Sequence, residues 1–518
     1  MNLSDIIFLV FYLPLWFALV RRDTQMFQQN SYRMARYARW YRQGHDTNRA
    51  VMTAAFAVVS LLPFIPHIEV CCVFMLFAAR AELRTVYKKP IVYTMRVRRL
   101  FFTAALLTAA VIAATTLLAP RYMPAVALGL LVFPIIMLAA NTANKPLEAA
   151  VARWYYNDAR RILHSMPDLV VIGVTGSFGK TSTKHYLYRI LSERYNVLMT
   201  PGNFNTTLGV IRTVREQLKP HHQVFIVEMG AKQTGDIREI CDLVHPTIGV
   251  VTAVGEMHLE TFRTVDNILH TKFELIDSLP ADGFGAVNLD SEPIAAFSAK
   301  HRCPVAGYAV ENGAADYRAV NIGYSPAETT FDVMHGGETR THYATRLAGR
   351  GNILNLLAAI AVADRMGVSE AMQKRAIRQI EQIEHRLSVK RTAGGITILD
   401  DAYNSNPAGA KMALEVLREF RTEGGRRIVV TPGFVELGAR QHELNRELGR
   451  DMAEACDMAV IVNLTNRDAI AEGLADGAFP DERIFKADSF AEASRILAAQ
   501  MRAGDAVLYE NDLPDSFK

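Results

Sequence analysis

Cysteine and tryptophan are scarce in this chain, whose 518 residues include five Cys and three Trp. None of the cysteines has the CxxC spacing of a zinc ribbon, and their number and spacing do not form a disulfide framework. Small domains held together by a zinc ribbon or by a disulfide framework are therefore excluded, and the cysteine usage suits a reducing compartment. Internal repeats and low-complexity segments are also absent from the sequence.

The chain has little net charge, +4, and its positive charge is concentrated in two places. Residues 21–49 contain seven Arg against two Asp, and residues 80–99 contain seven Lys or Arg against Glu82. This excess is larger than the net charge of the whole chain, so the remaining residues are net acidic. An extended basic surface is missing, and we expect no nucleic-acid partner.

Long apolar runs occur only in the first 141 residues, although half of all residues are hydrophobic. The runs cover residues 6–20, 51–79, 101–119 and 122–140. Their lengths predict membrane-spanning helices, with residues 51–79 forming either a hairpin of two spans or a re-entrant hairpin. The basic segments beside them place everything after Lys145 in the cytoplasm. The sequence thus predicts a multi-pass protein of a bacterial-type inner (plasma) membrane, with the lipid bilayer as a partner and cytoplasmic catalytic domains.

The stretch "VVIGVTGSFGKTSTKHY", residues 170–186, has the order strand, glycine loop, helix that a phosphate cradle requires. Gly176 and Gly179 let backbone amides approach phosphate, Lys180 reaches the outer phosphates, and the Thr181 hydroxyl can ligate magnesium. Val174 occupies the place of the first glycine in the strict pattern. The residues expected to bind nucleotide here are Gly176, Ser177, Gly179, Lys180, Thr181 and Ser182.

Two further residues are predicted at the same edge of an open α/β sheet. Glu228 ends the apolar run "VFIVE", and His258 follows the run "TIGVVTAVG". Parallel strands of such a sheet present their ligands at their carboxyl ends. The alternatives are that Glu228 is a solvated residue at the end of a strand and that His258 is structural. Because a phosphate loop is predicted beside them, a magnesium role is favoured for both residues.

Lys272 lies inside an apolar stripe of helical spacing that runs from Val265 to Leu279. A lysine in a buried stripe is costly unless it reaches solvent, pairs with an anion or is chemically altered. Its position in a nucleotide-binding domain makes it a candidate functional residue.

The order of motifs from about residue 170 to residue 437 resembles the Mur ligases, which are ATP-dependent enzymes that join a carboxylate to an amine. The matching pieces are "GVTGSFGKTS", "TPGNFNTTLGV", "VEMGA", "MHLETF", "TKFELI", "AGRGNILNLLAA", "HRL", "DDAYNSNP" and "ELG". Within the family, the chain is most similar to the enzymes that add D-alanyl-D-alanine to the peptidoglycan peptide. The resemblance implies ATP and Mg²⁺ as cofactors and an acyl-phosphate intermediate.

The resemblance also implies roles for individual residues. Magnesium would be held by Thr181, Glu228, His258 and a carbamylated Lys272, and Asn352 would lie near adenine. Arg386 and Asp401 would approach the phosphates from the C-terminal domain and join Lys180, His258 and Lys272 in catalysis. The substrate-binding residues would be Asn203, Asn205, Thr206, Asn404 and Asn406.

The predicted architecture has three parts. Residues 1–145 form an α-helical membrane region, residues 146–386 a P-loop α/β domain that binds ATP, and residues 387–518 a Rossmann-like C-terminal domain. The two globular parts correspond to the central and C-terminal domains of a Mur ligase.

Three features depart from the family pattern, two of them at the substrate ends and one before the adenine-side Asn352. Membrane helices stand where these ligases hold the UDP end of a precursor, "YENDLPDSF" replaces a Lys-Gly-Ser near the C-terminus, and Gly351 replaces a common His. We therefore expect a membrane-bound amide ligase whose partners are a peptidoglycan or other envelope precursor, UDP-linked or lipid-linked, and an amino acid or dipeptide amine. The alternatives are a polyglutamate-type synthase and a nucleotide-driven transport or sensor protein.

Overall fold

The structure is a computed structural model. It describes residues 3–30, 32–42, 68–85, 90–118, 132–298, 300–324, 328–403, 406–420 and 424–512. These residues form two compact units, one ending at Arg153 and the other running from Trp154 to Asp512.

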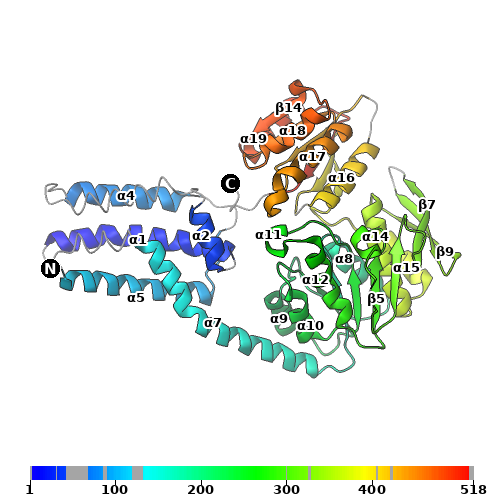
Figure 1. Ribbon diagram of the computed structural model, residues 1–518, viewed down its shortest axis with the longest axis horizontal. Helices are drawn as coiled ribbons and strands as arrows, with labels where there is room; N and C mark the ends of the chain where they lie inside the picture. The colour runs from blue at the N-terminus through cyan, green and yellow to red at the C-terminus, as the bar shows by residue number, and fades with distance from the viewer. Residues whose placement is uncertain are drawn as a thin grey trace. The chain divides into compact units, whose positions relative to one another are not determined.

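The first unit is helical. Its elements are α1 (Leu3–Gln29), α2 (Met34–Arg42), α4 (Ile68–Arg84), α5 (Met95–Leu118) and the first part of α7 (Phe133–His164). Helices α1, α4 and α5 run alongside one another (Figure 1), and α1 contacts both of the others. Its core includes Tyr12, Leu15 and Phe27 of α1, and the indole nitrogen of Trp16 donates to the Thr108 hydroxyl over 3.1 Å.

The prediction of a multi-pass inner-membrane protein with cytoplasmic catalytic domains is wrong. Among the described residues, one helical stretch, Met95–Thr115, is long and apolar enough to cross a membrane. The apolar run 6–20 belongs to a helix that continues through Arg21, Arg22 and Asp23 and packs its inner face into the helical core. Hydropathy alone does not distinguish such packed helices from lipid-facing ones. Most of the predicted hairpin, residues 51–67, and half of the run 122–140 lie outside the described residues.

The second unit contains a nine-stranded sheet in the order β2-β3-β1-β4-β5-β6-β7-β8-β9. Strands β1 to β7 pair in parallel, whereas β8 and β9 extend the sheet antiparallel. The strands are β1 (Val170–Thr175), β2 (Val197–Met199), β3 (Val224–Glu228), β4 (Ile248–Val251), β5 (Phe284–Asn288), β6 (Val305–Ala309), β7 (Tyr317–Tyr324), β8 (Thr329–His335) and β9 (Glu338–Thr345). The prediction of an open, largely parallel α/β sheet is confirmed.

Helices cover both faces of this sheet, and alternate residues of each strand serve the two sides. Phe225 and Val227 of β3 pack with α9, α10 and α12, whereas Ile226 packs with α8, α14 and α15. The helices are α8 (Lys180–Leu191), α9 (Thr207–Glu216), α10 (Asp236–Val244), α11 (Leu259–Phe262), α12 (Val265–Asp277), α13 (Glu292–Ala295), α14 (Arg350–Arg365) and α15 (Glu370–Arg378). Because β3 is buried on both faces, its sequence is apolar up to its last residue, Glu228, as expected for a parallel strand.

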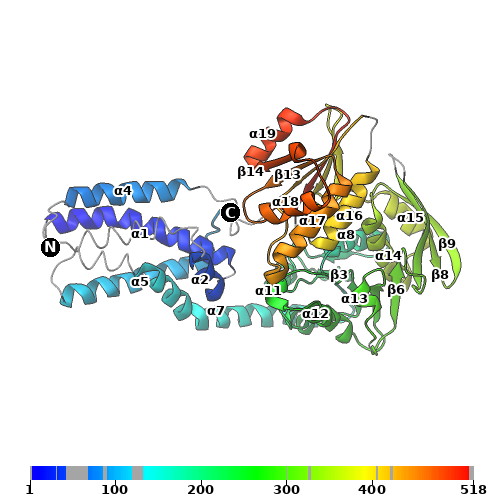
Figure 2. The ribbon, with the colours of Figure 1, turned by 45° about the horizontal axis from the view of Figure 1, so that its top comes forward.

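A second, six-stranded sheet follows in the order β10-β11-β15-β12-β13-β14. Apart from the antiparallel pair β10 and β11, its strands are parallel. Helices α16, α17 and α18 pack on one face and α19 on the other (Figure 2). The elements are β10 (Ser388–Arg391), β11 (Thr397–Asp401), α16 (Pro407–Glu419), β12 (Arg427–Thr431), η1 (Gly438–Arg440), α17 (Gln441–Ala455), β13 (Met458–Val462), α18 (Arg467–Asp476), η2 (Asp481–Arg483), β14 (Ile484–Ala487), α19 (Phe490–Gln500) and β15 (Ala506–Glu510).

The register of the nine-stranded sheet determines which strand ends lie next to one another. Val174 of β1 pairs with Glu228 of β3, and Thr175 pairs with Val251 of β4. The carboxyl ends of β3, β1 and β4 therefore lie side by side, with the chain turning to opposite sides of β1. Such a point in an open α/β sheet is the usual position of a ligand site.

Candidate active site

The phosphate loop, residues Gly176 to Gly179, is a tight turn between β1 and α8. Both of its end positions require glycine. Gly176 has φ 151° and Gly179 has φ 81°. A Cβ atom at Gly176 would lie 2.0 Å from the Thr252 hydroxyl oxygen, and one at Gly179 would lie 2.6 Å from Asn355 Oδ1. The Ser177 amide donates to the Ala253 carbonyl over 2.7 Å, which ties the loop to the chain after β4.

Lys180, the first residue of α8, folds back over the loop. Its Nζ donates to the carbonyls of Gly176 at 2.7 Å and Ser177 at 3.1 Å. Burial lowers the pKa of Lys180 to about 8, and Arg386 acts in the same direction, whereas Glu228 opposes the shift. An anion bound in the loop would favour the charged amine. The neighbouring Ser182 is buried on the same helix.

Glu228 is the centre of the polar contacts at the edge of the sheet. Its Oε1 accepts from the Thr181 hydroxyl at 3.2 Å and from Asn205 Nδ2 at 3.3 Å, and its Oε2 lies 2.9 Å from Lys184 Nζ. Burial disfavours the charged carboxylate, but Lys184 and Lys180 more than offset it and hold the pKa of Glu228 below its usual value. The residue is therefore an ionised, buried carboxylate.

Two further predicted residues, Lys272 of α12 and His258 at the start of α11, lie close enough for the lysine charge to act on the imidazole. Lys272 is 4% exposed, and burial, with a further contribution from Lys180, lowers its pKa to about 7. His258 has φ 54°, and its Nδ1 lies 2.5 Å from Glu436 Oε2. Burial lowers the pKa of His258 although Glu436 opposes the shift. The buried position predicted for Lys272 is confirmed.

Arg386 and Asp401 approach from the segment that leads into the second sheet. Arg386 Nη2 donates to the Thr181 hydroxyl at 3.3 Å, and its guanidinium stacks 4.3 Å from the centre of the Tyr403 ring. Asp401 accepts from the Leu387 amide at 3.0 Å. Burial raises the pKa of Asp401 to about 6, although Arg386 opposes this shift. Arg386 thus reaches the first turn of α8, and Asp401 acts on Arg386.

The predicted substrate and adenine residues divide into two groups. The Asn203 amide donates to the Tyr403 hydroxyl and Asn205 donates to Glu228, so both belong to the site. Thr206 and Asn406 instead cap helices α9 and α16, accepting from the amides of Gly209 and Gly409.

Asn352 lies in the core at the start of α14, where its amide is engaged on both sides. Its Oδ1 accepts from the Tyr186 hydroxyl at 2.7 Å and its Nδ2 donates to the Ala348 carbonyl at 2.8 Å. Direct contact with adenine would require an exchange of one of these bonds. The other predicted residue, Asn404, lies outside the described residues.

Sequence reasoning missed three residues that the structure brings to the site: Lys184, Tyr403 and Glu436. Lys184 was detectable, since it lies one helical turn after Lys180 and therefore on the same face of α8. Tyr403 and Glu436 lie within the motifs "DDAYNSNP" and "ELG", but only the fold shows which middle-domain residues they touch.

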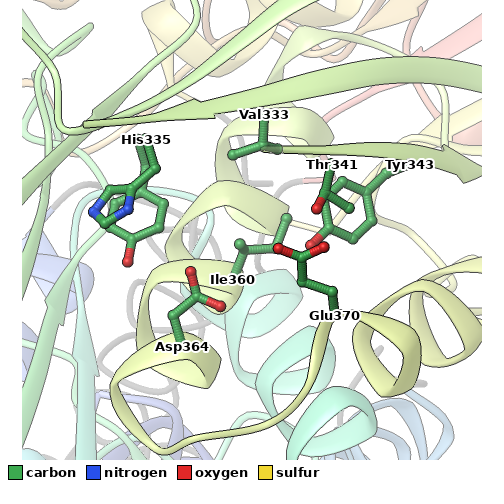
Figure 3. A pocket seen from close by; sticks show the side chains of 8 residues that line it. Val333, His335, Thr341, Tyr343, Ile360, Asp364 and Glu370 are labelled. Atoms are coloured by element: carbon green, nitrogen blue, oxygen red, sulfur yellow. The ribbon is translucent and has the colours of Figure 1, made fainter. Parts of the chain in front are cut away.

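A separate cavity lies between the antiparallel strands β8 and β9 and helices α14 and α15, away from the phosphate loop (Figure 3). It is partly open to solvent, its cavity volume is about 10 Å³, and it is lined by Tyr317, Val333, His335, Thr341, Tyr343, Ile360, Asp364 and Glu370. His335 Nδ1 and the Thr341 hydroxyl are buried there without a hydrogen bond. Water is the smallest partner for such atoms, and none of the predicted site residues lines the cavity.

Comparison with known proteins connects this geometry to a family. Residues 174–363 match the Mur ligase middle domain, and residues 385–509 match the Mur ligase, glutamate ligase domain. A UDP-N-acetylmuramoyl-tripeptide–D-alanyl-D-alanine ligase of Mycobacterium bovis is 30% identical over 66% of this chain and 70% of its own length. The relative of that name in Bacillus subtilis is also 30% identical, but the match covers only 59% of its length.

Solved structures agree with these matches. MurF from Acinetobacter baumannii superposes with a TM-score of 0.62 and 26% identity, over 70% of this chain and 77% of that one. MurF from Thermotoga maritima in complex with ADP superposes with a TM-score of 0.60 and 25% identity, over 70% of this chain and 80% of that one. The expected resemblance is confirmed: the chain belongs to the Mur ligase family of ATP-dependent ligases.

Proposed function

We propose that this chain joins the carboxylate of a peptidoglycan or other cell-envelope precursor to an amine, in the manner of the D-alanyl-D-alanine-adding ligases. The observation that carries the proposal is the ionised Glu228 beside Thr181, next to a glycine loop and surrounded by the cations Lys180, Lys184 and Arg386. The names of the relatives support the choice of substrates.

The work is divided between two parts of the chain. In this proposal residues 146–386 bind ATP, and residues 387–518 form the C-terminal domain, which supplies Arg386's neighbours Asp401 and Tyr403. Gly176, Ser177, Gly179, Lys180, Thr181 and Ser182 face the phosphates, and Asn352 stands on the adenine side.

Magnesium fits the oxygen donors at the edge of the sheet. The Thr181 hydroxyl and Glu228 Oε1 lie 3.2 Å apart, and the carboxylate is ionised. Within the described residues, no three His, Cys, Asp or Glu side chains converge on one point. Because Mg²⁺ commonly binds one or two protein oxygens and completes its shell with substrate phosphates and water, this short ligand set suits it. When bound, the ion would supply positive charge next to the phosphates.

The reaction begins when an oxygen of the substrate carboxylate forms a bond to the γ-phosphorus of ATP and the bond from that phosphorus to ADP breaks. The amine nitrogen then bonds to the acyl carbon and loses a proton, and phosphate leaves. Lys180 and Arg386 are placed to offset negative charge on the transferred group. Asn203 and Asn205, in the loop before α9, are placed to orient the carboxylate.

His258 is a further candidate ligand, and the carboxylate of Glu436 orients its ring. The contact of its Nδ1 with Glu436 fixes the ring, and such a carboxylate partner is the usual companion of a metal-binding imidazole. We propose that His258 joins Thr181 and Glu228 as a magnesium ligand.

Lys272 is proposed to carry a carbamate. A pKa of about 7 leaves much of its amine neutral near neutral pH, and the neutral amine is the form whose nitrogen can attack CO₂ and lose a proton. The product is an anion on which Lys180 acts, and the positive charge of that lysine would stabilise it.

A polyglutamate-type synthase is the second candidate, because the C-terminal match is to a glutamate ligase domain. The two candidates share the nucleotide site and differ in the amine, glutamate in one and D-alanyl-D-alanine in the other. The choice therefore depends on which amine stimulates turnover.

Turnover should depend on an acid, an amine and Lys180. With Mg²⁺ and ATP, we expect UDP-N-acetylmuramoyl-tripeptide plus D-alanyl-D-alanine to stimulate phosphate release. Lys180→Ala should reduce this rate by about two orders of magnitude, the usual effect of losing one charge-stabilising group. The control Lys374→Ala changes an exposed lysine on α15 and should leave the rate unchanged.

Stimulation by L-glutamate, with products that grow by repeated addition in mass spectra, would instead support the polyglutamate-type reaction. Turnover that no acid and amine stimulate would contradict both candidates.

The carbamate on Lys272 can be observed directly. Protein equilibrated with ¹³C-bicarbonate should give one slowly exchanging carbamate signal in the ¹³C spectrum, absent from Lys272→Met. The same signal in both proteins, or none in either, would contradict the assignment.

The free energy of unfolding should report the buried amine of Lys272 in bicarbonate-free buffer. Between pH 7 and 10.5 the unfolded chain keeps a proton that the folded chain has lost, because burial lowers the folded pKa from 10.5 to about 7. Stability must then rise with pH, by at most about 1.4 kcal/mol per unit. Urea denaturation from pH 7 to 8 should show this slope in the wild type and in the control Lys374→Met, in addition to the smaller rise that Lys180, with its pKa of about 8, adds in all three proteins. Lys272→Met should lose the part due to Lys272, and identical slopes in all three proteins would show that Lys272 is not buried as a neutral amine.

A further inference from the structure

The loop from Pro201 to Thr206 is attached to the phosphate site at several points. Asn205 donates to Glu228 Oε1 at 3.3 Å, and its carbonyl accepts from the Gly230 amide at 2.7 Å. On the other side of Asn203, the Gly202 carbonyl accepts from Lys184 Nζ at 2.6 Å. The loop that would face the carboxylate substrate is thus connected to Glu228 both directly and through Lys184.

Lys184 is an unusual residue for the inner face of a helix. Its side chain has 0% exposure and belongs to the largest fully buried side chains of the chain. Burying an ammonium is costly unless it is paired and hydrogen-bonded, and an apolar side chain would fill the same space without that cost. Lys184 forms an ion pair with Glu228 and a hydrogen bond to the carbonyl of Gly202, and these two partners lie on different segments.

The two lysines on this face of α8 have different partners. Lys180 donates to two carbonyls of the phosphate loop itself, at 2.7 and 3.1 Å, and these bonds can be exchanged for bonds to phosphate oxygens. The two partners of Lys184 lie outside the phosphate loop: Glu228 ends β3, and Gly202 lies in the Pro201–Thr206 loop before α9. The first lysine is therefore suited to bind nucleotide and the second to hold protein segments together.

We propose that Lys184 is a positioning residue that couples the Pro201–Thr206 loop to nucleotide binding through Glu228. Glu228 Oε1 accepts from Thr181, and Glu228 Oε2 pairs with Lys184. A ligand that binds Oε1 therefore also affects Lys184, whose Nζ donates to the Gly202 carbonyl of the loop. Nucleotide with Mg²⁺ then fixes the loop in the shape that receives the carboxylate substrate. This inference rests on the proposed function for the identity of that substrate, but not for the coupling itself.

Hydrogen–deuterium exchange of peptides covering residues 200–206 tests the coupling without any knowledge of the acid. In the wild type, ADP with Mg²⁺ should slow exchange in this loop. In Lys184→Met the loop should exchange about tenfold faster or more, because a charge-assisted bond to its backbone is lost. ADP, whose binding is followed separately by calorimetry, should still bind but no longer slow the exchange.

Two further variants separate positioning from general stability. Lys184→Met alone leaves Glu228 buried without its lysine, whereas Lys184→Met combined with Glu228→Gln removes both charges and should fold better. The double variant should keep the fast-exchanging loop. Ile190→Val is the matched control, since it trims a buried residue of the same helix within the core and should leave the loop as in the wild type.

The proposal is overturned if the loop exchanges at the wild-type rate in the folded double variant, or if ADP still slows the loop in Lys184→Met. Failure of the proposed ligase reaction would show differently, as an absence of acid- and amine-stimulated turnover in a protein whose loop still responds to ADP.

Discussion

A single buried carboxylate, Glu228, organises the polar contacts of the candidate active site. Three lysines and an arginine act on it or on one another, and Lys184 forms an ion pair with it at 2.9 Å. Keeping these ammonium groups charged is costly, because burial, with a smaller contribution from like charges, lowers the pKa of Lys180 to about 8 and that of Lys272 to about 7. A triphosphate is the kind of ligand that would remove this cost, and a glycine turn at the start of a helix, such as the one before α8, is a common phosphate-binding element.

The second sheet contributes to the same site through a few long side chains. Arg386 contacts Thr181, Tyr403 contacts Asn203, and Glu436 contacts His258. Each contact joins the C-terminal part of the chain to a different segment around the phosphate loop. A reaction that needs two substrates and a nucleotide at once gains from such contacts, since the full set forms only when all segments are in place.

Much of this site could be predicted from the sequence where local pattern and tertiary position agree. Glu228 ends an apolar run, and Lys272 interrupts an apolar helical stripe, so both positions followed from periodicity. Thr206 and Asn406 show the opposite case, because a polar residue before a helix serves equally well as a cap or as a ligand contact. Lys184 was missed since a lysine on a surface helix normally faces solvent, and only the packing of β3 and the loop against α8 encloses it. The N-terminal prediction failed for a related reason, because hydropathy records composition and not what a helix packs against.

The central claim, transfer of the γ-phosphoryl group to a substrate carboxylate, has a direct isotopic test. The acid substrate would be labelled with ¹⁸O in its carboxylate and turned over with ATP, Mg²⁺ and the amine, and the released phosphate analysed by mass spectrometry. The account predicts one ¹⁸O atom in each phosphate, because the acyl carbon–oxygen bond breaks when the amine attacks. Unlabelled phosphate from a reaction that forms the amide would contradict the acyl-phosphate route.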